Sequence, residues 1–219
     1  MDELMELAGV PKTSFYRVWA SKEEFFTRLL EELVLPDEFS GAAYDPETLV
    51  IGKRVVEENL TRLAEAPGRR AVLVEAVRLA AERNYWSTVN SPKWATYNAV
   101  VATLPGLAEE EKRSRILAAL RETERIFINR MAEFYDELLP VLKMRFKPGF
   151  DSHRLAAAGA AVVEGLAQRH LVNDDVVDSS LKGPGLDGKS VDWHLSAHSF
   201  LGILDSMVEP DDEEPELAH

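Results

Sequence analysis

The 219-residue sequence contains no cysteine, which excludes disulfide bonds and metal sites built on thiolates. It also has no apolar run of about 18 residues, the shortest stretch that usually crosses a membrane as a helix. The first residues lack the basic and then apolar pattern of a secretory signal peptide. From these absences we expect a cytoplasmic protein that does not interact with a membrane.

Basic residues are scarce. The chain has 25 Lys and Arg against 38 Asp and Glu, and its formal net charge is −13. Proteins that bind nucleic acid usually carry a basic surface, so this balance argues against long-range attraction to DNA. Between Leu7 and Lys22, however, there are three basic residues and no acidic one. A local basic surface of this kind is able to hold phosphates.

Signatures of catalysis are few. The Gly-x-Ser-x-Gly pattern of many hydrolases is missing. His194 and His198 are four residues apart and could share a metal with Asp192, but no glutamate follows His194 as in the zinc proteases. We interpret these two histidines as facing solvent or a partner subunit. The sequence therefore predicts no enzymatic activity, no cofactor and no bound metal.

The start of the chain predicts two short helices joined by a turn. Leu4, Leu7 and Ala8 are spaced i, i+3 and i+4, so they share one face of the first helix. Gly9 follows, at a position where a turn with positive φ is easiest for a residue without a Cβ atom. Pro11 suits the first turn of the second helix, because its missing N–H has no partner there in any case.

The second helix leads into a third. Phe15 and Val18 point inward at i and i+3, beside Trp19. Ser21 is placed to cap the third helix, and Glu24 three residues later completes a capping box. The outer face of the second helix carries Lys12, Thr13, Ser14, Tyr16 and Arg17. This order of elements is that of a helix-turn-helix, whose second helix enters the DNA major groove.

Residues 1–35 resemble the DNA-binding domain of the TetR family of bacterial transcriptional regulators. The family's pattern stands here as Ala8-Gly9-Val10, Pro11 to Tyr16, Trp19, Ser21-Lys22 and Glu23 to Phe26. The rest of the chain is similar to the family only in size and helical character. The resemblance implies an all-α fold, with an N-terminal helix-turn-helix over residues 1–45 and a C-terminal helical domain for ligand binding and dimerisation over residues 46–208.

The resemblance also implies a function. The protein would be a ligand-responsive repressor of transcription that binds a palindromic operator in double-stranded DNA as a homodimer. Tyr16 and Lys22 would hold the DNA backbone, Lys22 at a helix N-terminus that itself attracts phosphate. The residues expected to contact DNA are Lys12, Thr13, Ser14, Tyr16, Arg17 and Lys22.

One part of the family pattern is missing. The first helix of the family's DNA-binding domain, which covers the apolar face of the helix-turn-helix, has no counterpart before Asp2. Two interpretations stay open: the start codon has been placed too late, or the chain has lost DNA binding. In the second case the protein would be a dimeric small-molecule-binding protein with a degenerate helix-turn-helix. A helical enzyme with an aromatic pocket is a third alternative.

Beyond residue 45, glycine and proline mark the ends of further helices. Pro140 falls inside one helical stretch and should kink or split it at the preceding residue. No alternating pattern predicts a strand, and Gly183, Gly185 and Gly188 are interpreted as a linker. Residues 209–219 are acidic and contain two prolines, so we expect a disordered tail. The expected helices are 46–66, 69–88, 92–104, 108–146, 152–174 and 190–208.

The middle helices are expected to hold the effector. Phe127, Met131, Phe134 and Leu138 form an apolar stripe at helical spacing. Such a stripe has two explanations, a packed core or a pocket for a small hydrophobic or aromatic molecule. Both are apolar with few polar groups, so the pattern alone does not separate them. The predicted ligand contacts are Trp86, Trp94, Tyr97, Phe127, Met131 and Phe134. Candidate polar lining groups are Arg83, Asn84, Asn98, Glu124 and Asn129.

The last two helices are expected to form a dimer interface. Apolar residues from Trp193 to Val208 recur with helical spacing, and the helix from Ser152 carries a second apolar stripe beside small residues. A hairpin within one chain would show the same pattern, but in the TetR family these helices pair with their copies. The residues assigned to the interface are Leu155, Gly159, Val162, Leu166, Trp193, Ala197, Phe200, Leu201 and Leu204.

Overall fold

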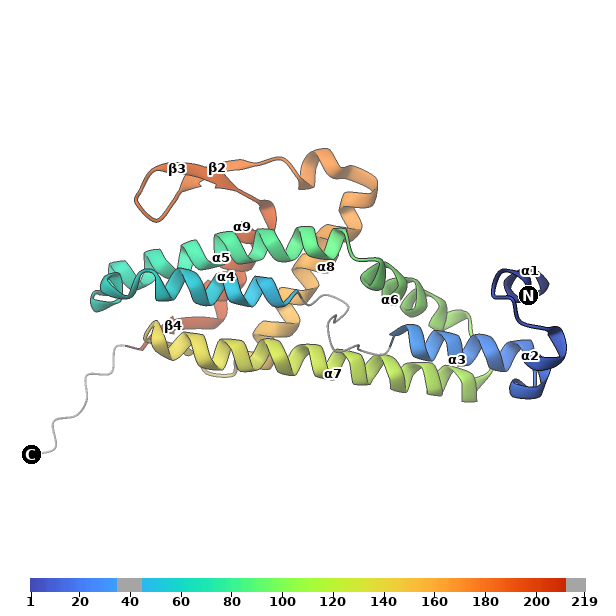
Figure 1. Ribbon diagram of the computed structural model, residues 1–219. Coiled ribbons are helices and arrows are strands. Elements are labelled where there is room, and N and C mark those ends of the chain that lie inside the picture. Colours follow the sequence, from blue (N-terminus) through green and yellow to red (C-terminus); the bar gives the residue numbers. More distant parts are fainter. Residues whose placement is uncertain (35–44, 212–219) are drawn as a thin grey trace, which may run out of the picture.

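The computed structural model describes residues 1–34 and 45–211, and helices dominate them (Figure 1). The predicted all-α fold class is confirmed, since the strands are short antiparallel pairs beside the helices. Within the described residues, no helix is both long and apolar enough to cross a membrane. In chain order the elements are α1 (Asp2–Leu7), α2 (Lys12–Val18), α3 (Lys22–Val34), α4 (Pro46–Glu57), η1 (Leu60–Ala64), α5 (Ala66–Val89), α6 (Pro92–Thr103), η2 (Leu104–Gly106), α7 (Glu110–Val141), β1 (Met144–Phe146), α8 (Ser152–Val177), β2 (Leu181–Pro184), β3 (Ser190–Trp193), α9 (Leu195–Met207) and β4 (Val208–Pro210).

The first three helices form an N-terminal unit. Gly9 makes the turn between α1 and α2 with a φ of 63°, the conformation expected of a residue without a Cβ atom. The Phe25 ring of α3 meets the rings of Phe15 and Trp19 edge to face, with centroids 5.2 and 5.5 Å apart. This aromatic cluster fixes α2 against α3.

Some side chains of the unit do not point where the sequence predicts. Leu7 is 82% exposed and Val18 is 67% exposed, and Leu4 also faces solvent. The helix α1 has six residues and packs mainly against α2, so Met5 is its buried side chain. The face that Leu4 and Leu7 share is therefore largely uncovered within the described residues, because so short a helix makes only a narrow contact.

The helix α7 reaches from the body to the N-terminal unit. It has 32 residues, so its length is about 48 Å at 1.5 Å per residue. Figure 1 shows it running along the body and on to α3. Ile116 and Leu120 pack with Val100 of α6 and Leu30 of α3. The other end of α7 packs against α8 and β1, so one helix contacts both parts of the protein.

The helix α5 lies at the centre of the body, in contact with α4, α8 and α9. Its residues Val72 and Tyr85 are fully buried, as is Leu155 of α8. At Gly159 the helices α8 and α9 come so close that an added Cβ would lie 2.7 Å from the Phe200 ring. The close approach that small residues on α8 predict is thus made to α9 of the same chain.

Several predicted boundaries are wrong. The stretch 46–66 is split into α4 and η1, because Asn59 leaves the helical region and its side-chain amide donates to the Val55 carbonyl at 2.8 Å. The helix α7 continues through Pro140 and ends one residue later, rather than breaking before the proline or continuing to residue 146. The proline therefore disturbs only the last turn of the helix.

A strand pair closes the C-terminal side of the body. Lys143 has a φ of 48° and directs the chain from α7 into β1. The strand β1 then pairs antiparallel with β4, with Arg145 opposite Glu209. Each strand has three residues, too few for an alternating pattern to appear in the sequence. The predicted tail thus begins inside a strand, and its residues 212–219 lie outside the described part of the chain.

The segment interpreted as a linker is a β-hairpin. The strands β2 and β3 pair with Gly183 opposite Val191, and Gly188 makes the turn with a φ of 73°. The Trp193 ring lies so close to Gly183 that an added Cβ there would be 2.8 Å from it. The linker interpretation is wrong because the glycines serve a tight turn and a close ring contact, not flexibility.

Gly68 offers a test of how tightly the chain turns from η1 into α5. A Cβ at this position would lie 1.9 Å from the backbone oxygen of Arg62, a contact that no side-chain rotation relieves. We expect Gly68→Ala to lower the free energy of unfolding by about 1–3 kcal/mol in urea denaturation. Gly165→Ala is the matched control, because no atom lies within 4 Å of its added Cβ in α8. The control should be neutral or gain about 0.5–1 kcal/mol; equal losses in both variants would contradict the close contact.

Candidate functional site

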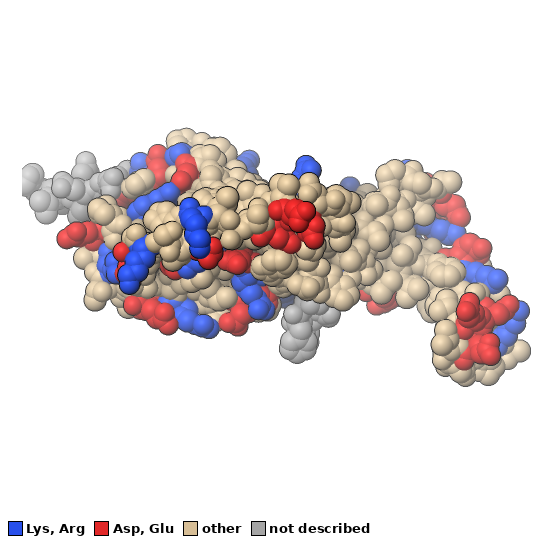
Figure 2. Space-filling view, turned by 90° about the horizontal axis from the view of Figure 1, so that it is seen from above, with Lys and Arg blue, Asp and Glu red and all other residues tan. Residues whose placement is uncertain are grey.

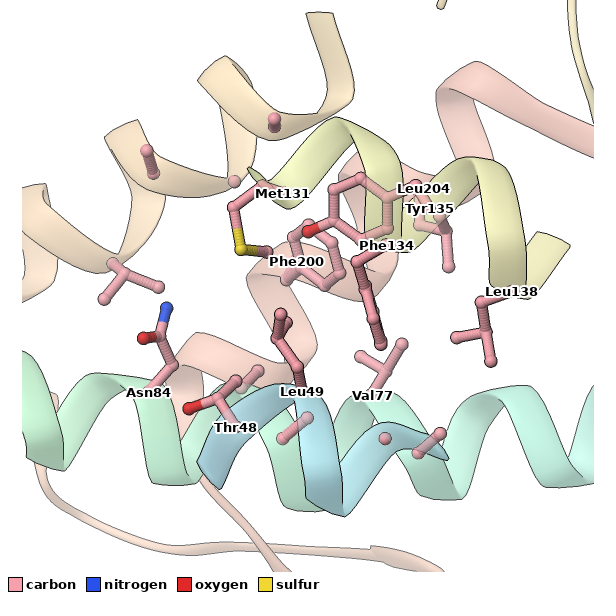
Figure 3. Close-up of a pocket in the computed structure, with 18 of the residues that line it drawn as sticks. Thr48, Leu49, Val77, Asn84, Met131, Phe134, Tyr135, Leu138, Phe200 and Leu204 are labelled. Carbon is pink, nitrogen blue, oxygen red and sulfur yellow. The ribbon is translucent and has the colours of Figure 1, made fainter. Parts of the chain in front are cut away.

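A cavity of about 70 Å³ lies between α4, α5, α7, α8 and α9. Figure 3 shows its side chains converging from these helices. Three of the predicted ligand contacts, Phe127, Met131 and Phe134, line it, and so does the predicted polar candidate Asn84. The other lining residues are Thr48, Leu49, Gly52, Leu73, Ala76, Val77, Ala80, Ala81, Tyr135, Leu138, Leu139, Ala156, Gly159, Ala160, Val163, Phe200 and Leu204.

The cavity results from pairing small residues with aromatic rings. Alanine and glycine from α4, α5 and α8 face phenylalanines from α7 and α9. At Gly52 an added Cβ would lie 3.0 Å from the tip of the Phe134 ring, and at Gly159 it would meet Phe200. Flat rings set against small side chains leave space that longer aliphatic side chains would fill. The shape of the cavity is therefore a consequence of these residue choices.

Its lining is almost wholly apolar. Among the described residues that line it, none carries a charge, and the polar ones are Thr48, Asn84 and Tyr135. The Thr48 hydroxyl donates to the Asp45 carboxylate at 3.2 Å. The Asn84 amide and the Tyr135 hydroxyl have no hydrogen-bond partner within the described part of the chain.

Tyr135 is the most unusual member of the lining. It is only 7% exposed, and its hydroxyl points between Met131 and Phe200 in Figure 3. Burial raises the pKa of this hydroxyl above its ordinary value, so it stays protonated and is a hydrogen-bond donor. Sequence reasoning missed it, because a tyrosine beside Phe134 in an apolar stripe is also typical of a packed core.

The remaining predicted ligand contacts lie elsewhere. Trp94 is buried against Phe127 and Ala167, outside the cavity lining. Trp86 is at the surface, where it contacts the rings of Tyr85 and His194. Of the polar candidates, Arg83 pairs with Asp45 at 2.6 Å, and Asn98 accepts a hydrogen bond from Gln168 at 3.2 Å.

Tyr97 belongs to a second, more open groove of about 530 Å³ between α6 and α7. Glu124 and Asn129 line it as well. Burial raises the pKa of Tyr97 to about 12, with help from the nearby carboxylates of Glu124 and Glu164. The predicted ligand residues are therefore divided between the cavity, the groove and the core, and only the α7 stripe and Asn84 reach the cavity.

The residues assigned to a dimer interface are mostly inside the chain. Leu155, Gly159, Trp193, Ala197 and Leu204 are buried in contacts between α5, α8 and α9. Four others are half-buried and keep part of their surface exposed: Val162, Leu166, Phe200 and Leu201. A partner subunit would meet α8 and α9 through surfaces of this second group.

The predicted DNA contacts share one surface of the N-terminal unit. Lys12, Thr13, Tyr16 and Arg17 of α2 and Lys22 at the start of α3 are exposed, and Ser14 is half-buried. Lys12 pairs with Asp2 of α1 at 3.2 Å, an ion pair between two exposed groups. Figure 2 shows acidic and basic side chains next to one another over this unit. The surface is thus polar and mixed in charge rather than uniformly basic.

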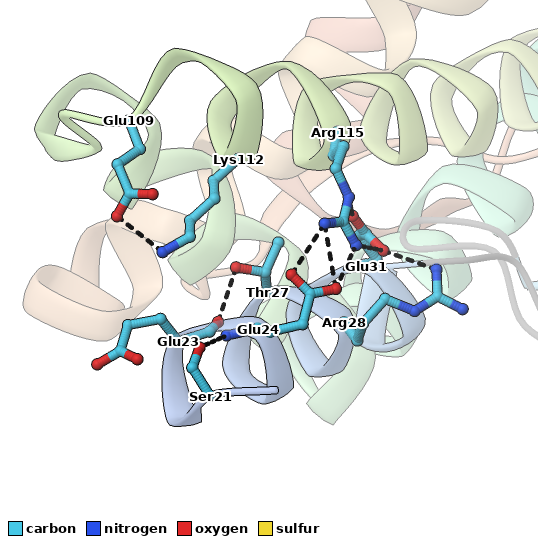
Figure 4. A network of polar contacts seen from close by, with 9 residues as sticks. All are labelled: Ser21, Glu23, Glu24, Thr27, Arg28, Glu31, Glu109, Lys112 and Arg115. Carbon is cyan, nitrogen blue, oxygen red and sulfur yellow. Dashed lines mark hydrogen bonds and ion pairs between the residues drawn. The ribbon is translucent and has the colours of Figure 1, made fainter. Parts of the chain in front are cut away.

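An ion-pair network joins α3 to α7 (Figure 4). Arg115 of α7 contacts the carboxylate of Glu24 at 3.1 Å and that of Glu31 at 2.7 Å. Arg28 adds a second cation 2.9 Å from Glu31, whose side chain is 8% exposed. The Ser21 hydroxyl caps α3 as predicted, accepting from the Glu24 backbone N–H at 3.0 Å. The reciprocal half of the capping box is replaced, because the Glu24 carboxylate binds Arg115.

The two histidines considered as metal ligands have different surroundings. His194 is 4% exposed and caps α9, accepting from the Ser196 backbone N–H at 3.1 Å, so the prediction that it faces solvent or a partner is wrong. Burial lowers its pKa, although Asp178 lies 4.0 Å away. His198 stacks on Trp193 at the surface. In the described part of the chain, no group of three or more possible ligands gathers to hold a metal.

Residues 183–190 spell Gly-x-x-x-x-Gly-Lys-Ser, the letters of a phosphate-binding loop. That loop needs a strand before it and a helix after it, with backbone N–H groups free for phosphate. Here it forms the hairpin between β2 and β3. The Gly185 N–H donates to the Lys189 carbonyl at 2.8 Å, and the Gly188 N–H donates to the Gly185 carbonyl at 2.9 Å. The match is therefore not a nucleotide site.

Comparisons with known proteins do not assign the chain. No protein-family model, curated protein or solved structure matches it. Functional inference therefore rests on the cavity, the surface of α2, and the helix α7, which lines the cavity and contacts α3.

Two buried tyrosines provide a stability test. Among the described residues the Tyr135 hydroxyl has no partner, whereas the Tyr85 hydroxyl donates to the Asp178 carboxylate at 2.5 Å. We expect Tyr135→Phe to change the free energy of unfolding by less than about 0.5 kcal/mol, and Tyr85→Phe to lower it by about 1.5–3 kcal/mol. Urea denaturation of both variants measures this. A large loss in Tyr135→Phe would mean that its hydroxyl is bonded within the protein.

The half-buried carboxyl of Glu164 should make the free energy of unfolding depend on pH. Burial, together with nearby Glu124, raises its pKa from 4.5 to about 7. Between pH 4.5 and about pH 7 the Glu164 carboxyl is ionised in the unfolded chain and still protonated in the folded protein. The free energy of unfolding therefore falls as the pH rises through this range, and the decrease is complete above about pH 7. Glu164→Gln should therefore raise the free energy of unfolding by about 1–3 kcal/mol at pH 8 and much less at pH 5. Glu122→Gln, which removes a surface partner of Arg125, should show no such gain.

Proposed function

We propose that the protein is a TetR-like transcriptional regulator that binds DNA through α2 as a homodimer and responds to a small molecule in the cavity between α4, α5, α7, α8 and α9. One observation carries the proposal: α7 lines the cavity with Phe127, Met131 and Phe134 and holds α3 through Arg115. A ligand site and a candidate DNA-binding surface are thereby joined by a single helix. This arrangement supports control of DNA binding by ligand.

The surface of α2 supports the DNA-binding role. Its exposed side chains include Arg17, which forms no hydrogen bond or ion pair within the described residues, and Tyr16, which is partly supported by the Phe15 ring at 5.1 Å. Arginine is suited to both phosphate and guanine, and tyrosine to phosphate. Lys22 stands at the N-terminus of α3, where the helix dipole adds to its attraction for phosphate.

The small size of the α2 surface favours a homodimer. One seven-residue helix makes few base contacts, whereas a two-fold pair reads two half-sites about one helical turn of DNA apart. The partly exposed side chains of Val162 and Leu166 on α8 and Leu201 on α9 offer an apolar surface for the second copy. We place the dimer contact there.

The response to ligand requires two arrangements of the same protein. A ligand shifts their populations only if it binds one better than the other. A molecule larger than the cavity would displace the side chains of α7 or the helix itself, and Arg115 would carry this displacement to Glu24 and Glu31. The spacing of the two α2 helices in the dimer would then change.

The second candidate is a dimeric ligand-binding protein without DNA affinity. The ion pair of Lys12 with Asp2 favours it, because part of the basic surface is neutralised within the unit. The net charge of −13 also opposes approach to DNA. The cavity and its connection to α3 would serve a protein partner equally well in that case.

Selection from a random DNA duplex pool at low salt separates the two candidates. The proposed regulator should enrich a palindrome, and Arg17→Ala should weaken binding to it about tenfold or more. Arg54→Ala is the matched control, since it also removes one exposed arginine but lies on α4 beside Glu47. Its effect should stay below about twofold at moderate salt. Failure to enrich any sequence would favour the ligand-binding protein.

A further inference from the structure

We infer that the cavity between α4, α5, α7, α8 and α9 takes an uncharged, largely apolar molecule with one hydrogen-bond acceptor, to which the Tyr135 hydroxyl donates. The inference rests on the proposed function only in using the same cavity as the ligand site. It does not require DNA binding, because the chemistry of the ligand is set by the residues that line the cavity. Asn84 and Thr48 complete the polar groups at its wall.

The absence of charge in the lining excludes ionic ligands. None of the described lining residues is Asp, Glu, Lys, Arg or His. A carboxylate or an ammonium group placed there would be buried without a counter-ion, which is far more costly than burying a neutral polar group. A neutral molecule with apolar surface meets the phenylalanine and leucine side chains of the wall without this penalty.

The Tyr135 hydroxyl requires a partner that the described protein does not supply. The residue is only 7% exposed, but its hydroxyl oxygen is not among the fully buried atoms that lack a partner, so it faces the space of the cavity, where a ligand atom is able to accept its hydrogen bond. A ligand carbonyl, ether or hydroxyl oxygen between Met131 and Phe200 would accept from it (Figure 3). The Phe200 ring is nearly parallel to Tyr135, at 26° and 6.1 Å between centroids, which holds the hydroxyl in its direction.

The size of the cavity limits the ligand to one small ring or a short chain. At about 70 Å³ it is smaller than a cavity of about 150 Å³ that accepts benzene in an engineered protein. The wall is able to give way at Met131, whose unbranched side chain adapts to new shapes more easily than the rings do. A substituted benzene therefore fits only when Met131 and neighbouring side chains of the wall move together, and a much larger molecule would have to separate the helices.

Three probes of similar shape test the ligand class with the full chain. Acetophenone carries a carbonyl acceptor, isopropylbenzene replaces it with an apolar group, and benzoate adds a charge. Calorimetric titration should detect acetophenone and isopropylbenzene but not benzoate. Filling the cavity with Ala160→Leu, or with Ala80→Leu if the first variant does not fold, should abolish both. Binding of benzoate as tight as that of acetophenone, or binding unchanged in a folded filled variant, would overturn the inference.

The Tyr135 hydroxyl is tested by a ratio of dissociation constants. The constant for isopropylbenzene divided by that for acetophenone should fall about fivefold in Tyr135→Phe, because one neutral hydrogen bond is lost. Tyr85→Phe is the matched control, as this tyrosine lies outside the lining, and it should leave the ratio unchanged. An unchanged ratio in Tyr135→Phe would overturn the assignment of the hydroxyl. Duplex selection is independent of these titrations, so loss of DNA binding alone would affect only the proposed function.

Discussion

The contact of Arg115 with Glu24 and Glu31 is the interaction on which the relation between the two parts of the protein depends. Glu31 is a carboxylate with an 8% exposed side chain, and a buried charge is tolerated only when it is paired. Arg28 and Arg115 provide that pairing from α3 and α7. Arg115 and Arg28 keep 33% and 47% of their side chains exposed, so solvent screens these pairs. The apolar contact of Leu30 with Ile116 and Leu120 acts together with them to hold α3 against α7.

The cavity is a second constraint and acts against stability. A cavity of about 70 Å³ would cost on the order of 2 kcal/mol if no other atoms occupied it, at the usual cost per unit of cavity volume. A larger aliphatic residue at Ala160 would fill part of this space. A sequence that keeps both the space and the hydroxyl is consistent with binding a ligand there.

The sequence predicted where helices begin and end better than it predicted which residues pack against one another in the folded protein. Pro and Gly located most helix ends, and Ser21 was rightly placed as a cap, because these effects act within a few residues. His194 was misplaced, since its burial depends on Tyr85 and Asp178 from other elements. Of the ligand contacts, only those on the α7 stripe reach the cavity. Trp86 and Trp94 do not, because helical spacing tells which residues share a face but not what that face meets.

The binding energy available in the cavity limits how far a ligand could shift the protein between two arrangements under the proposed function. Filling the cavity would recover on the order of 2 kcal/mol, and a hydrogen bond to Tyr135 about 1 kcal/mol more. If only one arrangement of α7 offers the site, this total of about 3 kcal/mol sets the ligand's preference for that arrangement, roughly a hundredfold. A complete switch from 1:99 to 99:1 needs about 5.5 kcal/mol. A small molecule in one cavity would therefore shift the population only part of the way, and two cavities in a homodimer, acting on one shared equilibrium, would supply the remainder.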